Sequence, residues 1–364
     1  MRGSLQDKLH YGYLIGGKMK RIAFFDTKPY DLTFFKEYGK DYRIKYFENK
    51  LNMDTASLAK GFDGVIAFVN DDISAGTIDK LYEGGVRVIA LRSAGYNNVD
   101  FRAAFDKINI VRVPAYSPYA VAEHAMALLL TLNRKTHKAY NRTREFDFRL
   151  SGLVGYDLHG KTIGIIGTGK IGRVFANICR GFSMRVLAYD IYPAKDSGLE
   201  YTDLDTLLSQ SDIISLHCPL TESTHHIIND QSIKKMKDGA VIINTSRGQL
   251  IDSDRLLAAL KSGKLGGAGL DVYEEESEFF FEDFSQSVIR DDILSVLVSL
   301  PNVVVTSHQA FLTGEALENI ARTTINNLDE FFSGKYLNNE ICYQCKNGDI
   351  GPDCEKRKKG ERCF

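Results

Sequence analysis

Residues Thr162 to Asp190 read TIGIIGTGKIGRVFANICRGFSMRVLAYD, and this stretch decides the fold of the chain around it. An apolar strand, Thr162 to Ile166, leads directly into three glycines with G-x-G-x-x-G spacing, Gly167, Gly169 and Gly172. The first glycine makes a tight turn, the second lets the backbone approach a pyrophosphate, and the third lets the next helix pack closely on the strand. The N-terminus of that helix offers free N–H groups and positive potential to phosphates. The pattern predicts a dinucleotide-binding unit.

The second strand of this unit, Met184 to Tyr189, ends at an acidic residue, Asp190, which lies 23 residues after Gly167. That separation is close to the ~20 residues at which a carboxylate binds ribose hydroxyls in such folds. A carboxylate at this place accepts hydrogen bonds from the ribose and repels a 2′-phosphate, so NAD is favoured over NADP. Because strand, glycine turn, helix and acid occur in the required order, the motif is more specific than glycine spacing alone.

The composition excludes several classes of function. Basic and acidic residues nearly balance, 46 against 47, so no overall field attracts nucleic acid or an anionic membrane. No apolar run approaches the ~18 residues that a membrane span needs, and no secretory hydrophobic region occurs near the start. A length of 364 residues allows two domains. We expect a cytoplasmic protein with neither a membrane nor a nucleic-acid partner.

The two ends of the chain differ from the rest. Residues 1–18 begin with Met-Arg-Gly-Ser, which resembles a vector leader, so we place the start of the fold at Met19. Residues 342–364 are rich in lysine and arginine and poor in apolar residues, which predicts a disordered extension. Cys342 and Cys345 have the C-x-x-C spacing of metal or redox sites, but no second C-x-x-C follows. We therefore expect no metal site.

Strands alternate with helices between these ends, which indicates parallel sheets with right-handed crossovers. A long helix, Ala120 to Arg142, precedes the glycine motif and connects two domains, and a second helix, Gly314 to Phe332, returns to the first domain. We expect an α/β fold of two Rossmann-like or flavodoxin-like parallel-sheet domains separated by a cleft. The nucleotide domain, 118–312, is inserted in a discontinuous substrate domain, 19–117 and 313–341.

Three polar residues follow predicted strands, where ligands bind in open α/β sheets. They are Arg247, Glu276 and His308. Reduction of a 2-keto acid needs a guanidinium for the carboxylate and carbonyl oxygens and a proton donor for the forming alkoxide, and histidine is the usual donor near neutral pH. A carboxylate on the other ring nitrogen fixes the tautomer. The alternatives stay open from the residues alone: a surface ion pair for Arg247, a solvated loop for Glu276 and a structural role for His308.

The other histidines of the strand–helix region have simpler interpretations. His124, inside the long helix, and His217, beside Cys218-Pro219, are interpreted as packing residues. His225 and His226 are interpreted as loop residues.

The chain resembles the D-2-hydroxyacid dehydrogenase family over about Met19 to Ile341, and within it the NAD-dependent enzymes that act on D-lactate. The stretches that carry the resemblance are Phe68-Val-Asn-Asp-Asp72, Leu91-Arg-Ser-Ala-Gly-Tyr-Asn-Asn-Val99, Arg112-Val-Pro-Ala-Tyr-Ser117, Val121-Ala-Glu-His-Ala125, Ser215-Leu-His-Cys-Pro-Leu220, Asn244-Thr-Ser-Arg-Gly248, Phe280-Phe-Glu-Asp283 and His308-Gln-Ala-Phe-Leu312. The resemblance implies NADH-dependent, stereospecific reduction of pyruvate to D-lactate.

The resemblance also implies the roles of individual residues. Arg247 binds the substrate, Glu276 is the carboxylate behind the histidine, and His308 is the proton donor. Backbone N–H groups near Ala94 and Gly95 hold the substrate carboxylate. The residues implied to shape a small pocket are Tyr116, Phe311 and, less directly, Phe68.

For the cofactor, the resemblance adds residues to the glycine motif. Lys170 and Ile171 lie at the pyrophosphate and Asp190 at the adenosine ribose. Further residues line the groove or its nicotinamide end, namely Cys218, Pro219, Thr224, Thr245, Ser246, Arg247 and Asp271. Position 224 departs from the asparagine that some members of the family carry, which puts Thr224 in most doubt.

Two other functions remain as alternatives. One is the same chemistry on a larger 2-keto acid, and the other is a non-catalytic NAD-sensing binding protein with the same fold. The resemblance further implies a homo-oligomer, a dimer through the nucleotide domain or a tetramer, and the apolar helix Ala120 to Arg142 suits such a surface.

Overall fold

The computed structural model describes residues 19–194, 196–276 and 279–343, which form two compact units. The chain divides between Tyr116 and Ser117 and again between Ala316 and Leu317. These positions lie one residue before and four residues after the expected boundaries. The described part of unit 1 is therefore 19–116 and 317–343, and unit 2 is the segment between them. The expected leader and the tail beyond Tyr343 lie outside the described residues.

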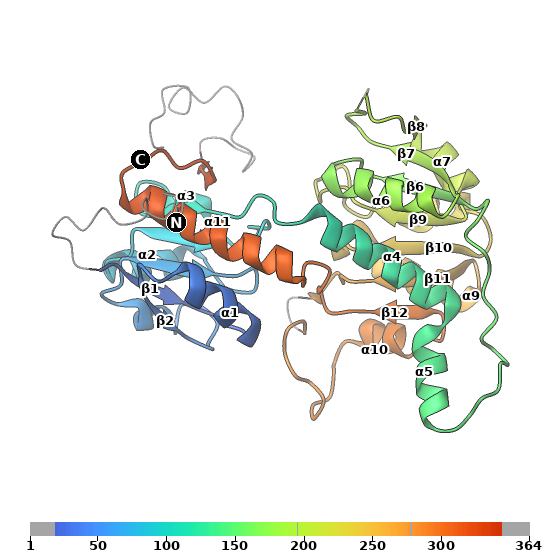
Figure 1. The fold of residues 1–364 in the computed structure, drawn as a ribbon, viewed down its shortest axis with the longest axis horizontal. Helices are drawn as coiled ribbons and strands as arrows, with labels where there is room; N and C mark the ends of the chain where they lie inside the picture. The colour runs from blue at the N-terminus through green and yellow to red at the C-terminus, as the bar shows by residue number, and fades with distance from the viewer. Residues whose placement is uncertain (1–18, 195, 277–278, 344–364) are drawn as a thin grey trace, which may run out of the picture. The chain divides into compact units, whose positions relative to one another are not determined.

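Unit 2 contains a parallel sheet that has seven strands in the described part of the chain, in the order β12-β11-β10-β9-β6-β7-β8 (Figure 1). The strands are β6 (Thr162–Ile166), β7 (Arg185–Tyr189), β8 (Glu200–Tyr201), β9 (Ile213–Leu216), β10 (Ala240–Asn244), β11 (Leu265–Leu270) and β12 (Val303–Val305). Every residue of β9 and β10 is buried, because helices cover both faces of the sheet.

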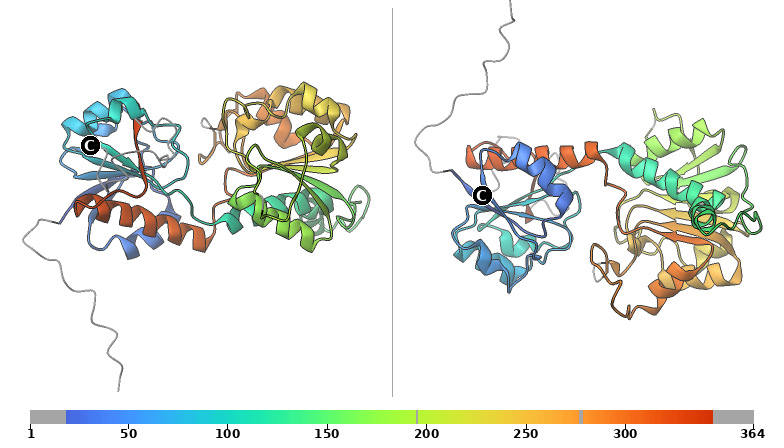
Figure 2. Two further views of the ribbon diagram at one scale, coloured as in Figure 1. Left: turned by 90° about the horizontal axis from the view of Figure 1, so that it is seen from above. Right: turned by 60° about the horizontal axis from the view of Figure 1, so that its bottom comes forward.

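Two sets of helices cover this sheet. One core joins the sheet to α4 (Pro118–Arg134) and α6 (Lys170–Gly181). The other joins it to a second set of helices, α7 (Leu204–Gln210), α8 (Asp230–Lys235), α9 (Ser253–Ser262) and α10 (Asp292–Ser299). Figure 2 shows helices on both sides of this sheet. The doubly covered parallel sheet confirms the predicted nucleotide-binding architecture.

Unit 1 contains a second sheet, with six strands in the residues described, in the order β13-β5-β4-β3-β1-β2. The strands are β1 (Arg21–Phe24), β2 (Arg43–Tyr46), β3 (Gly64–Ala67), β4 (Val88–Leu91), β5 (Asn109–Val111) and β13 (Glu340–Ile341). One core adds a 3-10 turn (Ala56–Ala59), α2 (Ala75–Glu83) and α3 (Phe101–Ala104), and the other adds α1 (Pro29–Tyr38) and α11 (Gly314–Phe332). None of the described helices combines the length and apolar character needed to cross a membrane.

The C-terminal end of unit 1 corrects the expected start of the tail. Strand β13 pairs antiparallel with β5, so this sheet is not parallel throughout. Cys342, which we had placed in the disordered tail, is 3% exposed and therefore belongs to the core. The expected end of the domain, Ile341, is the last residue of β13, so that boundary stopped one residue short of the buried Cys342.

The long helix expected over Ala120 to Arg142 is wrong as a single element. It is divided into α4 and α5 (Thr136–Arg144) by Lys135, whose φ of 50° is left-handed. The side chain of Asn133, two residues before Lys135, bonds the backbone of Tyr156 through both its amide and its carbonyl group, at 2.8 and 2.9 Å. These bonds connect the end of α4 to the segment that leads to β6. The helix ends at Arg134, and the chain turns at Lys135.

The turn at Lys135 gives the first testable prediction. A side chain costs about 1 kcal/mol in the left-handed region, and glycine recovers part of this after its larger entropy loss on folding. Lys135→Gly should therefore raise the free energy of unfolding by about 0.5 kcal/mol, measured by urea denaturation. Lys135→Ala, which removes the same long side chain but keeps Cβ, is the matched control. A glycine variant no more stable than the alanine variant would contradict the assignment of strain.

Candidate active site

Three neighbouring strands of unit 2 bring the candidate residues to one edge of the sheet. Strands β10, β11 and β12 are parallel and adjacent, and the last residues Asn244, Leu270 and Val305 are partners in register. The segments that follow them carry Arg247, Glu276 and His308, respectively. Since the carboxyl ends of parallel strands meet at the same edge, all three segments begin side by side.

Glu276 and His308 form a direct pair. The distance between His308 Nδ1 and Glu276 Oε1 is 2.8 Å, and Glu276 Oε2 accepts the N–H of Tyr273 at 2.9 Å. An ionised carboxylate only accepts hydrogen bonds, so the imidazole donates from Nδ1. His308 Nε2 has no hydrogen-bond partner among the described residues. The pair therefore presents one ring nitrogen to a ligand, in an orientation that the carboxylate fixes.

The backbone of His308 is strained and is held by Asp271. His308 has φ of 50°, in the left-handed region, and its N–H donates to the carbonyl of Asp271 at 2.7 Å. The Asp271 carboxylate accepts the next two N–H groups, those of Gln309 at 2.9 Å and Ala310 at 2.8 Å. A strained residue persists only where its surroundings over-determine it, and Asp271 supplies that restraint.

The same carboxylate has two further partners. Asp271 Oδ1 accepts the Thr306 hydroxyl at 2.5 Å, and it lies 3.2 Å from Nε2 of His124. Although burial raises the pKa of Asp271, the bonds from His124 and Thr306 outweigh it and hold that pKa below its ordinary value. Asp271 thus stays ionised while fully buried. The interpretation of His124 as a packing residue is wrong, because its ring completes this network.

Arg247 is half-buried and lacks an ionic partner. Its Nη1 donates to the carbonyl of Ser246 at 2.6 Å, and no carboxylate of a described residue lies within ion-pair distance of it. The alternative of a surface ion pair is therefore wrong for the described chain. The next residue, Gly248, is pressed against the segment that leads to Glu276, since a Cβ there would lie 2.0 Å from the carbonyl carbon of Tyr273. The loops of Arg247 and Glu276 are in backbone contact.

The glycine motif forms a cradle that fits a dinucleotide. Gly167 has φ of 96°, and a Cβ on it would lie 2.4 Å from the N of Cys218. A Cβ on Gly172 would lie 2.1 Å from the carbonyl oxygen of Gly167, so the helix packs closely on the turn. Gly169 has no atom within 4 Å of its Cβ position, and α6 begins at the next residue, Lys170. Open space at a free helix N-terminus is what a pyrophosphate requires.

Asp190 follows β7 beside that cradle. Its Oδ2 accepts the N–H and the hydroxyl of Thr168 at 2.6 and 2.9 Å, and its Oδ1 accepts the N–H of Tyr192 at 2.9 Å. The carboxylate is only partly exposed. Three hydrogen bonds hold its carboxylate in position next to the glycine turn, which suits an acceptor for ribose hydroxyls.

The remaining candidate cofactor-binding residues differ in the hydrogen bonds that they already make within the protein. Burial raises the pKa of the Cys218 thiol to about 11, so this thiol is neutral, and the Cys218 carbonyl accepts the Ser246 hydroxyl at 2.7 Å. The Thr224 hydroxyl donates to the carbonyl of exposed Pro219 at 2.7 Å and accepts the N–H of Thr221 at 2.8 Å. The Thr224 hydroxyl therefore stabilises the loop to which it belongs.

Thr245 differs from Cys218 and Thr224 in its hydrogen bonding. Its hydroxyl is buried without a hydrogen-bond partner in the described structure. Such an orphan is uncommon in a folded protein. Its place directly after β10 makes it a suitable contact for a bound polar group. Ile171, in the first turn of α6, is half-buried and adds an apolar wall there.

Unit 1 carries the other candidates. The carbonyls of Ala94 and Gly95 accept bonds from Arg112 and from the Ser93 hydroxyl at 2.9 and 2.8 Å. Their N–H groups donate to no described residue, so both remain available to an anion. Phe68 is 5% exposed and lies 3.9 Å under the guanidinium of Arg92, which makes it a core ring.

Two further pocket candidates lie in different units. Tyr116 is the last residue of unit 1 and its carbonyl accepts the amide of Asn319, while Phe311 is a buried residue of unit 2.

Sequence reasoning missed Thr168, Thr306 and the role of His124. Each acts through a contact with a residue far away in the sequence, Thr168 with Asp190 and the other two with Asp271. For the two threonines, a place within two residues of a strand end was the only available signal, and it is a weak one.

His217 gives a pH-dependent prediction. Its ring packs against Phe175, as interpreted, its Nε2 lies 2.9 Å from the Ser215 hydroxyl, and burial lowers the pKa of His217 to about 3. An unfolded histidine titrates near pH 6.5. The contribution of neutral His217 to the free energy of unfolding is therefore fully present above pH 6.5. Below that pH, a proton binds His217 in the unfolded chain but not in the folded protein, and the free energy of unfolding falls by about 1.4 kcal/mol at pH 5.5.

The measurement is the free energy of unfolding at pH 7.5 and 5.5 for the parent and for His217→Gln. Other groups titrate equally in both proteins, so the difference isolates this residue. The variant should lose less stability on acidification than the parent. Equal losses would contradict the account.

Comparisons with known proteins agree with this geometry. Residues 126–310 match the family described as "D-isomer specific 2-hydroxyacid dehydrogenase, NAD binding domain". The D-lactate dehydrogenase of Escherichia coli K12 is 48% identical over 327 residues, which cover 88% of this chain and 99% of that protein.

Two solved structures extend the comparison. One, from work on the pyruvate reductase of Chlamydomonas reinhardtii, has a TM-score of 0.85 and 44% identity over 88% of this chain and 98% of that one. The other, a D-isomer specific 2-hydroxyacid dehydrogenase of Lactobacillus delbrueckii in its NAD-complexed form, has a TM-score of 0.73 and 31% identity over 88% of this chain and 100% of that one.

Proposed function

The chain belongs to the D-isomer specific 2-hydroxyacid dehydrogenase family, as its motifs predicted, and we propose that it reduces pyruvate to D-lactate with NADH. NAD is its cofactor. The observation that carries the proposal is the Glu276–His308 pair beside an arginine without an ionic partner, on a sheet edge that also holds a dinucleotide cradle. A carboxylate substrate supplies what that arginine lacks.

Each residue then has a defined task. Bound NADH supplies the hydride that reaches the keto carbon. His308 gives the proton on Nε2 to the carbonyl oxygen, and Glu276 stabilises the imidazolium that donates it. Arg247 polarises the same oxygen and binds the substrate carboxylate. In unit 1, the N–H groups of Ala94 and Gly95, which donate to no described residue, also suit a carboxylate.

Replacement of the proton donor tests the mechanism. In His308→Gln, turnover with pyruvate should fall by ~10²–10⁴, because an amide cannot supply a proton. The affinity for NADH should stay nearly unchanged, since the glycine cradle lies on other loops. Steady-state rates and NADH fluorescence titration measure the two effects. His159→Gln, at an exposed histidine of unit 2, is the control and should retain full activity. An unaffected rate in His308→Gln would remove this residue from the mechanism.

Two readouts separate the alternative functions. A panel of 2-keto acids compares kcat/KM for pyruvate with that for larger substrates, and the chirality of the product is recorded. A non-catalytic NAD sensor would bind NADH without consuming it in the presence of any keto acid. The polar network around His308 favours catalysis, because a sensor has no need of an oriented proton donor.

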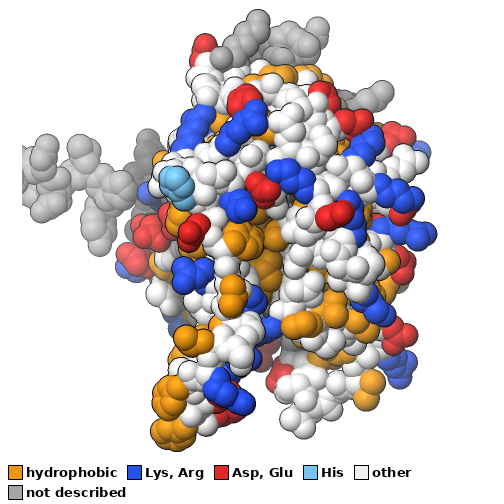
Figure 3. All heavy atoms as spheres, turned by 90° about the vertical axis from the view of Figure 1, so that its right-hand side faces the viewer, with side chains coloured by type: hydrophobic (Ala, Val, Ile, Leu, Met, Phe, Trp, Pro, Cys, Tyr) orange, Lys and Arg blue, Asp and Glu red, His pale blue; other side chains and the backbone are white. Residues whose placement is uncertain are grey.

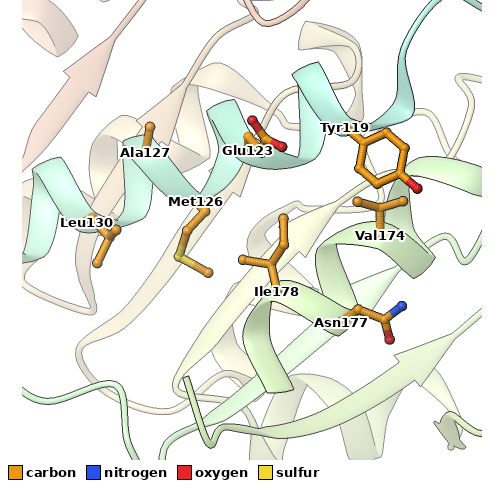
Figure 4. A pocket seen from close by; sticks show the side chains of 8 residues that line it. All are labelled: Tyr119, Glu123, Met126, Ala127, Leu130, Val174, Asn177 and Ile178. Carbon is orange, nitrogen blue, oxygen red and sulfur yellow. The ribbon is translucent and has the colours of Figure 1, made fainter. Parts of the chain in front are cut away.

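We also propose that two copies of the chain associate through unit 2. Helices α4 and α6 border an apolar groove, and Figure 4 shows Met126 and Ile178 in the space between these helices. Tyr119, at the start of α4, is 61% exposed. The matching apolar face of a second copy would cover this surface.

A second exposed apolar segment supports the same proposal. It follows α5 and includes Phe146, Phe148, Leu150 and Val154, which are 70–83% exposed. Figure 3 views unit 2 and shows hydrophobic side chains on the face of this unit that is turned toward the viewer and at the lower end of that face. Monomeric proteins rarely leave so many large apolar side chains exposed together.

A charged substitution in the groove tests the association. Ala127 lines the groove on α4 and is exposed, so Ala127→Arg should disrupt the dimer without disturbing the core. Light scattering after gel filtration measures the mass. Ala258→Arg places the same charge on an exposed alanine of α9 and should leave the mass unchanged. A monomeric parent, or an Ala127→Arg protein with the mass of the parent, would refute the proposal.

The cytoplasm is the compartment that we propose. Cys179, Cys218 and Cys342 carry free, buried thiols, and reducing compartments keep thiols in this state. Supply of NADH to the reaction also fits a metabolic compartment inside the cell.

A further inference from the structure

We propose that His225, His226 and Glu274 form a binding site for a divalent transition-metal ion of the zinc class, on the surface of unit 2. Their ligating atoms all lie within 4.8 Å of one another, and theirs is the one group of three or more such ligands found in the described residues. None of the three has a task in the proposed reaction. From sequence alone, both histidines are interpreted as loop residues and no metal is expected.

The backbone places two consecutive side chains on the same side. His226 has φ of 50°, a left-handed conformation that histidine rarely adopts. In an extended chain, neighbouring side chains point to opposite faces, whereas here the two imidazole rings stack with centroids 3.9 Å apart. Backbone bonds hold this turn, from His225 N–H to the carbonyl of Thr221 and from His226 N–H to that of Gln249, both at 2.9 Å.

The carboxylate comes from a different loop and is already oriented. Glu274 Oε1 lies 2.6 Å from Nε2 of His226, and its Oε2 accepts the N–H of Ser253 at 3.3 Å. Both side chains of this pair are 20–30% exposed, so an ion can reach them from solvent. A metal ion would replace the proton that the pair shares, and the ring of His225 would supply the third ligand.

The donor set indicates the class of ion. Two imidazole nitrogens and one carboxylate oxygen, with water completing the shell, suit Zn²⁺ and its borderline neighbours. Mg²⁺ and Ca²⁺ prefer shells made of oxygen ligands. The strained turn supports a ligand role, because such strain clusters where a binding geometry is built. In the simpler alternative, His226 and Glu274 only join two loops, and His225 has no role.

Removal of His225 distinguishes these two interpretations. His225→Ala leaves the His226–Glu274 pair intact and lies on an exposed side chain, so the variant should fold. Zn²⁺ binding to the full-length parent and variant is measured by equilibrium dialysis with elemental analysis and by calorimetric titration. We expect the parent to bind one more Zn²⁺ ion per chain than the variant, or to bind that ion at least 100-fold more tightly. Ions held by the C-terminal cysteines contribute equally to both proteins and cancel.

Further variants make the test specific. Glu274→Gln keeps a hydrogen-bond partner for His226 but removes the charge, and it should weaken the same ion. His159→Ala, at an exposed histidine outside the cluster, should bind like the parent. Ca²⁺ and Mg²⁺ should not compete. Zn²⁺ should raise the melting temperature of the parent more than that of His225→Ala, since an ion that binds the folded state stabilises it. Equal Zn²⁺ stoichiometry and affinity in parent and His225→Ala would overturn the proposal, as would an equal loss in His159→Ala.

Discussion

The buried carboxylate of Asp271 is the constraint on which the rest of the site depends. It lies directly after β11, is fully buried, and accepts bonds from two consecutive backbone N–H groups, a hydroxyl and an imidazole. These bonds hold the backbone on both sides of His308, which has a left-handed conformation and whose imidazole pairs with Glu276. Without the carboxylate, the segment after β12 would relax to an ordinary loop and the ring would lose its fixed direction.

The three segments that carry the site are coupled through the sheet. Register between β10, β11 and β12 fixes where each begins, and Gly248 lets the Arg247 loop lie against the segment that leads to Glu276. These mostly buried strands thus hold an arginine without an ionic partner and a histidine whose Nε2 has no hydrogen-bond partner among the described residues. Unit 2 thus holds these polar groups in place before a ligand binds to them, which is the arrangement expected for a preorganised site.

Sequence reasoning reached the elements with a strong periodic or spacing signal. Strand β6, the glycine turn, α6 and Asp190 lie where the motif predicted them, and α11 has the predicted bounds. The pairing of Glu276 with His308 followed from family resemblance, because a separation of 32 residues carries no local signal. The break at Lys135 was missed, since it depends on side-chain bonds from Asn133 to a distant segment.

The role of His124 was missed for a similar reason. Its position in an apolar helix indicated packing, whereas its partners Asp271 and Thr306 each directly follow a strand, and only the folded sheet brings these strand ends together. The left-handed turn at His226 is equally invisible in sequence, because nothing but tertiary contacts selects it. Contacts between distant segments are thus the part of the site that local patterns leave open.

In the proposed reaction, Arg247 and His308 act on one carbonyl oxygen. The most direct test is a crystal structure of the protein with NADH and a non-reducible analogue of pyruvate, in which two distances are measured. We expect Nε2 of His308 and a guanidinium nitrogen of Arg247 both to lie within hydrogen-bond distance, about 2.7–3.2 Å, of the oxygen that corresponds to the carbonyl. An analogue bound with that oxygen away from either nitrogen would contradict it.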